Sequence, residues 1–191
     1  MITFSELVEI ISENRLNTYL RLADDNKEKA VNIYFENLKI SQKLYYNLHW
    51  LEIALRNEIN KQLIEKYELD WCNTFDFNQK EKNKIDKCKK YLEEHKYQPS
   101  NQNIVANLSF GFWVSIFNNS YEELWRHCLR SSFKSQITIK RKTIYKSLDA
   151  ILKIRNRFSH HECIIKFQET FDKELRYILS LINSKLLDLL I

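Results

Sequence analysis

The residue types best suited to chemistry in this chain are Arg155, Asn156 and His160, which stand together near the end of one helical pattern. Arginine holds a phosphate through two parallel hydrogen bonds and stabilises the negative charge that grows when phosphorus is attacked. Histidine takes a proton from a ribose 2′-hydroxyl or returns one to a leaving oxygen. An asparagine amide fixes an imidazole tautomer or a phosphate oxygen. Together these groups are the parts for metal-independent cleavage of RNA, ending in a 2′,3′-cyclic phosphate.

The spacing of the three residues limits the helix that must carry them. Apolar residues recur at helical spacing just before them, at Ile144, Leu148, Ile151 and Leu152. Asn156 and His160 are four residues apart and share a face. Arg155 and His160 are five apart, so on a straight helix they point about 140° away from each other. We therefore expect the helix to bend or end near Ser159, or a second subunit to complete the group.

A structural role for the same residues stays open on these observations. Arg155 continues the core-facing stripe, and an isolated buried charge destabilises a fold unless it finds partners. Such partners could be the carbonyl groups at the ends of neighbouring helices, bound by Arg155 and Asn156.

Metal and nucleotide cofactors are not expected. Residues 160–163 read His-His-Glu-Cys, but adjacent residues cannot all reach one ion from regular backbone, and no further ligands stand at zinc or iron spacing. A single glycine, Gly111, also excludes a glycine-rich phosphate loop.

The charge distribution favours a phosphate-rich partner such as RNA. The formal net charge is +5, but residues 124–161 carry +9 and the rest of the chain −4. A solvated basic face, or one that docks on an acidic partner chain, would give the same pattern. The positive side chains of this segment are Arg126, Arg130, Lys134, Lys140, Arg141, Lys142, Lys146, Lys153, Arg155 and Arg157. Those that we expect to contact RNA are Arg141, Lys146, Lys153 and Arg157.

The composition predicts an all-α protein. One glycine and one proline among 191 residues leave almost none of the turn residues that a β-sandwich or barrel needs. The length fits a single domain, with the helices of residues 1–95 packed on a motif-bearing bundle of residues 100–191. No apolar run is long enough to span a membrane, and the acidic N-terminus is not a signal peptide. Four widely spaced cysteines indicate a reduced, cytosolic protein.

Several helices are predicted in detail. We expect a first helix capped by Ser5, a break at 24–26, and a long helix from Lys27 with a joint near Ser41. Residues 79–95 read as a charged, solvated helix, and the aromatic residues of 108–117 as core rather than a stacking surface for bases. A last apolar stripe either packs or forms a partner surface, and it comprises Phe171, Leu175, Ile178, Leu179, Ile182, Leu186 and Leu189.

A second Arg-Asn dipeptide, Arg56-Asn57, lies within residues 51–59. Glu52 stands four residues before Arg56, in the order that favours an ordinary surface ion pair. Nothing local gives this pair a function.

Three motifs in one order carry a family resemblance. Residues 155–160 fit the Arg-x4-His signature of the HEPN superfamily of helical ribonucleases. The wider motifs are LEIALRNEI at 51–59, LSFGFW at 108–113 and RNRFSHHE at 155–162. Over about residues 40–165 the chain resembles the Abi-like proteins of bacterial abortive infection.

The resemblance implies a HEPN-like helical bundle with extra N-terminal helices, and a homodimer that faces two motif copies across a two-fold axis. It implies RNA cleavage that stops growth during phage infection, or a toxin restrained by an antitoxin or another defence-system partner. Arg155 would then bind the scissile phosphate, Asn156 would orient the reacting groups, and His160 would be the acid or base. The supporting residues would be His161, Glu162, Arg56 and Asn57.

Two other functions compete with the nuclease. The same residues could hold phosphate in a catalytically silent RNA-binding or regulatory protein. Alternatively, the chain could be a protein-interaction module that acts through its last apolar stripe.

Overall fold

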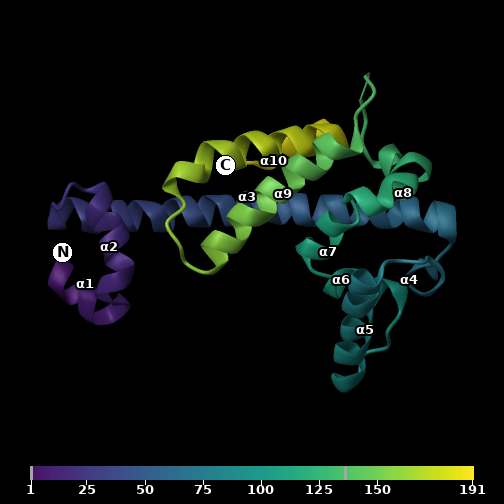
Figure 1. The fold of residues 1–191 in the computed structure, drawn as a ribbon, viewed down its shortest axis with the longest axis horizontal. Helices are drawn as coiled ribbons and strands as arrows, with labels where there is room; N and C mark the ends of the chain where they lie inside the picture. The colour runs from purple at the N-terminus through teal and green to yellow at the C-terminus, as the bar shows by residue number, and fades with distance from the viewer. Residues whose placement is uncertain (1, 136) are drawn as a thin grey trace.

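The structure is a computed structural model that describes residues 2–135 and 137–191, and these residues form helices and loops without a β-strand. One long helix, α3 (Lys27–Tyr67), organises the fold (Figure 1). Its 41 residues make it about 60 Å long at 1.5 Å per residue. The prediction of an all-α protein is confirmed.

The other elements gather at the two ends of α3 and around its length (Figure 1). Before α3 come α1 (Phe4–Ile11) and α2 (Glu13–Leu22). After it come α4 (Trp71–Thr74), α5 (Gln79–Glu94), α6 (Asn101–Asn107), α7 (Phe110–Ser115), η1 (Asn119–Tyr121), α8 (Glu122–His127), η2 (Leu129–Ser132), α9 (Arg141–Ser159), η3 (Ile165–Phe167), α10 (Gln168–Asn183) and η4 (Ser184–Leu189).

Side-chain caps begin the first helices. The Asn26 side chain accepts a hydrogen bond from the backbone N–H of Lys29 at 2.9 Å, so the predicted break before α3 is confirmed. α1 is capped by Thr3 and not by Ser5, because Thr3 and Glu6 form a reciprocal capping box.

The joint expected near Ser41 is absent, and α3 continues through this position. The Ser41 hydroxyl donates to the carbonyl oxygen of Asn37 at 2.8 Å, four residues back, a bond that a serine inside a helix can make without ending it. The 41-residue helix also contains no glycine or proline that would break it.

Two apolar clusters hold the fold together. The main core runs from Leu44 to Ile182, and α10 packs against both α3 and α9 within it. A smaller cluster from Leu7 to Val31 joins α1 and α2 to the start of α3. The boundary between the two clusters therefore lies within α3, between Val31 and Leu44. The last apolar stripe packs, since five of its members are buried, namely Phe171, Leu175, Ile178, Leu179 and Ile182.

The middle of the chain adds an aromatic part to the main core. Phe110, Phe112 and Trp113 are buried, which confirms that the aromatic residues of this segment are core. Glu81 is also buried, unlike the solvated surface expected for residues 79–95. Its carboxylate accepts a hydrogen bond from the hydroxyl of Tyr121 at 2.8 Å.

No helix in the described part of the chain is long and apolar enough to cross a lipid bilayer.

Candidate functional site

The motif helix α9 ends at Ser159, one of the alternatives that its residue spacing left open, and His160 is its C-terminal cap. The backbone N–H of His161 donates to Phe158 O at 3.0 Å, and that of Glu162 donates to Arg157 O at 2.9 Å. This pair of bonds is a Schellman motif, which satisfies carbonyl groups at the end of a helix.

His161 occupies the left-handed position of that motif, with φ at 58°. Glycine usually stands there, and an L-residue costs roughly 1–2 kcal/mol in this conformation. The carbonyl oxygen of His161 accepts a weak hydrogen bond from Arg15 Nη1 of α2 at 3.4 Å. The loop after α9 is therefore held in a strained conformation by groups outside it.

Asn37 of α3 is the main clamp on this loop. Its side chain is buried, and its Oδ1 accepts a hydrogen bond from the backbone N–H of Ile164 at 2.8 Å. Its Nδ2 donates to Glu162 O at 3.4 Å. None of the sequence motifs includes Asn37. The available signal was an amide seven residues before Leu44, on the core-facing side of α3.

Replacing Asn37 with leucine should destabilise the fold and disturb the motif together. The buried N–H of Ile164 would lose its partner, at a cost of about 1–3 kcal/mol. If the motif is catalytic, RNA cleavage should fall roughly ten- to a hundredfold, because displacements of about 1 Å have such effects. Urea unfolding and cleavage of a fluorescent RNA would measure the two changes.

Asn47→Leu is the matched control. Asn47 is also a buried amide of α3, and it makes the same pair of bonds with the backbone of Ile191, both at 3.1 Å. Its replacement should destabilise the fold similarly but leave the activity of the folded protein unchanged. Equal losses of activity in both variants would mean that Asn37 has no special relation to the motif.

His160 lies between two cavities. The first has a volume of about 650 Å³ and lies between α2 and the loop after α9. The second measures about 600 Å³ and is bounded by α9 and the start of α10. Four side chains line both cavities: Arg157, His160, Glu162 and Phe167. Asn156 and Lys153 line the second cavity, so the structure brings them to the same side of α9 as His160.

Arg155 points to another side of α9, toward α3. Its Nε lies 3.7 Å from Oε1 of Glu52, and both side chains are only partly exposed. In the described part of the chain, Arg155 lines neither of the two cavities beside His160. Its recorded partner is thus a carboxylate, and not the helix-end carbonyl groups of the structural alternative.

Glu52, which belongs to the motif at 51–59, contacts Arg155 of the motif at 155–162 and so links these two segments, a role that no sequence pattern indicated. Burial raises the pKa of the Glu52 carboxyl above its ordinary value, although Arg155, Arg56 and His49 act in the opposite direction. Instead of pairing with Glu52, Arg56 donates to Asn57 Oδ1 at 3.3 Å and to Ala106 O at 3.5 Å. The surface ion pair predicted between Glu52 and Arg56 is therefore replaced by a contact between helices.

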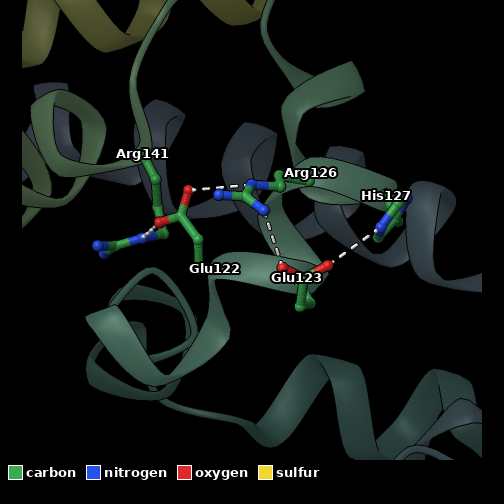
Figure 2. Close-up of polar contacts among 5 residues, drawn as sticks. All are labelled: Glu122, Glu123, Arg126, His127 and Arg141. Atoms are coloured by element: carbon green, nitrogen blue, oxygen red, sulfur yellow. Dashed lines mark hydrogen bonds and ion pairs between the residues drawn. The ribbon is translucent and has the colours of Figure 1, made fainter.

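Arg141 does not belong to this region. It begins α9, about 28 Å along the helix axis from His160 at 1.5 Å per residue. Its Nε donates to Glu122 Oε2 at 2.6 Å (Figure 2). Its Nη1 donates to Phe117 O. The side chain is only 11% exposed. These hydrogen bonds hold α9 to α8, so Arg141 has a structural role, and its contact with RNA stays a prediction.

Acidic side chains from outside residues 124–161 neutralise part of that basic segment. Arg126 contacts Glu122 and Glu123 (Figure 2). Arg157 Nη1 donates to Glu162 Oε2 at 2.8 Å. Lys153 contacts Asp149 within the segment, and this hydrogen bond raises the pKa of Lys153.

Lys146 is exposed on α9, about 21 Å along the axis from His160. Of the four side chains expected to contact RNA, Lys153 and Arg157 thus line a cavity that His160 also lines, whereas Lys146 and Arg141 stand farther along the helix.

Among the residues that the structure describes, no three His, Cys, Asp or Glu side chains are grouped so that they could hold a metal ion. Comparisons with protein-family models, with curated proteins and with solved structures found no match.

Proposed function

We propose that this protein is a metal-independent endoribonuclease of the HEPN type, which stops growth as a phage-defence effector or as the toxin of a toxin–antitoxin pair. The observation that carries the proposal is the position of His160 between two cavities that both contain Arg157, with Asn156 beside it in the second. An RNA strand that passes His160 would lie along both cavities.

In this mechanism, His160 removes the proton from the ribose 2′-hydroxyl or protonates the 5′-oxygen that leaves. Arg155 binds the scissile phosphate and stabilises the charge that develops on its oxygens. The products are a 2′,3′-cyclic phosphate and a 5′-hydroxyl. Arg157 and Lys153 then neutralise neighbouring phosphates.

A dimer would bring the separated groups together. In-line attack needs a base and an acid on opposite sides of phosphorus, and one chain supplies a single His160 at this place. Arg155 also faces α3 rather than the cavities beside His160 within one chain. Exposed residues border the Arg155 contact on α3, where Tyr45 and His49 precede Glu52 at helical spacing. We infer that this surface meets its two-fold copy.

The purified protein should cleave single-stranded RNA in the presence of EDTA and leave 2′,3′-cyclic phosphate ends. A substrate with one 2′-deoxynucleotide at the cleaved position should resist cleavage there, because the attacking hydroxyl is missing. Mass spectrometry of the fragments identifies the ends directly.

Cleavage per mole of protein should also fall when dilution dissociates the dimer, as followed by light scattering. Three results would each contradict part of this proposal. They are 3′-phosphate ends that form without a cyclic intermediate, cleavage at the 2′-deoxynucleotide, and full activity of a monomer.

A further inference from the structure

The larger cavity beside His160 holds more positive charge than its own residues neutralise. Arg15 and Arg21 enter it from α2, and Arg157 and Lys166 from the other side. The one acid in its lining, Glu162, already accepts a hydrogen bond from Arg157 at 2.8 Å. An anionic ligand would therefore bind favourably in this cavity, particularly through the two arginines of α2.

The same cavity also offers flat and apolar surface. Phe167 lines it, with the Arg157 guanidinium 4.9 Å and the Lys166 ammonium 5.1 Å from the ring centroid. Leu22 and Ile165 complete an apolar part of the wall. An unpaired base can stack on an aromatic ring or on a guanidinium plane, whereas a base inside a duplex presents no free face.

The size of the cavity fits one such unit. Its volume of about 650 Å³ lies within the range of about 300–1,000 Å³ that is typical of pockets for small ligands. A double helix cannot enter a pocket of this size, but one splayed nucleotide can.

We propose that this cavity binds one unpaired nucleotide of an RNA strand, next to the phosphate that His160 attacks. Arg15 and Arg21 hold its phosphates, and its base lies against Phe167 and Leu22. The inference rests on the proposed function and deepens it, since it makes single-stranded RNA the substrate and α2 the element that selects it. His160 then separates this nucleotide from its neighbour in the second cavity.

Arg21 gives the cleanest test of this site. It is exposed, and its Nε donates to Asn17 O within its own helix at 3.2 Å, so Arg21→Gln leaves the loop after α9 intact. Arg176, exposed on α10 and outside the lining of this cavity, provides the matched control Arg176→Gln. The probe is a short fluorescent single strand of 2′-O-methyl RNA, which lacks the attacking hydroxyl and therefore binds without being cleaved.

Fluorescence anisotropy should show that Arg21→Gln weakens single-strand binding about tenfold. The fall of log K with log salt should become shallower, its negative slope shrinking in magnitude by about 0.7. Arg176→Gln should bind like the wild type, and a duplex of the same sequence should bind weakly to all three proteins. Equal affinities of the two variants would overturn the site, as would equal binding of single strand and duplex. Adenosine monophosphate that binds as tightly as the strand would instead show a pocket for free nucleotides.

These outcomes are independent of catalysis. If the strand binds as expected but unmodified RNA is never cut, the nucleotide site stands and the proposed ribonuclease function fails. If RNA is cut with the expected ends but Arg21→Gln binds and cleaves like the wild type, the ribonuclease function stands and this site fails.

Discussion

Replacing His160 with alanine should abolish growth arrest on induction and reduce RNA cleavage about 10²–10⁴-fold, which is the usual contribution of a general acid or base. The fold should survive the change. His160 is exposed, and the hydrogen bonds that end α9 are donated by backbone N–H groups, those of His160, His161 and Glu162, which do not depend on the His160 side chain. The free energy of unfolding should therefore change by no more than about 0.5 kcal/mol.

His95→Ala is the matched control for this experiment. His95 is also an exposed histidine just after a helix, at the end of α5, and it lines neither cavity beside His160. Its replacement should leave both growth arrest and cleavage intact. Arrest that persists in His160→Ala would reject the catalytic role of His160. If the wild type and His160→Ala both bind RNA and neither cleaves it, the catalytically silent alternative is favoured.

Local sequence patterns were sufficient for the all-α class and for most helices, but not for the cap of α1 or for the continuity of α3 at Ser41. The angle between Arg155 and His160 favoured an end or bend of α9 near Ser159, or completion of the group by a second subunit. The structure places the last residue of α9 at Ser159, but this does not bring Arg155 to His160. Helical spacing also identified core-facing residues of α9 and α10. These features depend on neighbours within a few turns, which the sequence displays directly.

The partners of the motif residues could not be predicted in this way. The i, i+4 rule favoured Arg56 as the partner of Glu52, but packing of α9 on α3 placed Arg155 there instead. Asn37 likewise bonds a loop 125–127 residues away in sequence. The charge of residues 124–161 was also a poor guide to free positive charge, because Glu52, Glu122 and Glu162 lie outside that segment and contact it.

Arg155→Ala should have two effects that can be separated. The like charges of Arg157 and nearby lysines alone would predict unchanged or slightly higher stability. Glu52 reverses this expectation, because removing Arg155 leaves a partly buried carboxylate without the charge that most lowers its pKa. Both side chains are more than a third exposed, so solvent screening limits the loss at neutral pH to about 1 kcal/mol.

The pH dependence of stability identifies the origin of that loss. Because the pKa of Glu52 is raised in the folded state, folding favours its protonated form. Protonated Glu52 contributes its full stabilisation below its pKa in the unfolded chain, near 4.5. This contribution is lost as the pH rises through the higher pKa of Glu52 in the folded protein. Arg155→Ala should move this loss to higher pH, and Glu52→Gln should remove it. Urea unfolding between about pH 4.5 and pH 8 would measure both changes.

The double variant Glu52→Gln/Arg155→Ala then separates the stability of the fold from catalysis. A neutral amide needs no cation beside it, so the double variant should recover the stability that Arg155→Ala loses. Cleavage should stay at least about a hundredfold below wild type, since the donor to the scissile phosphate is still missing. Arg155→Lys should keep most of the stability but little of the activity, because an ammonium cannot make the two parallel bonds of a guanidinium. Cleavage that returns with stability in the double variant would mean that Arg155 is a clamp between α9 and α3 rather than part of an active site.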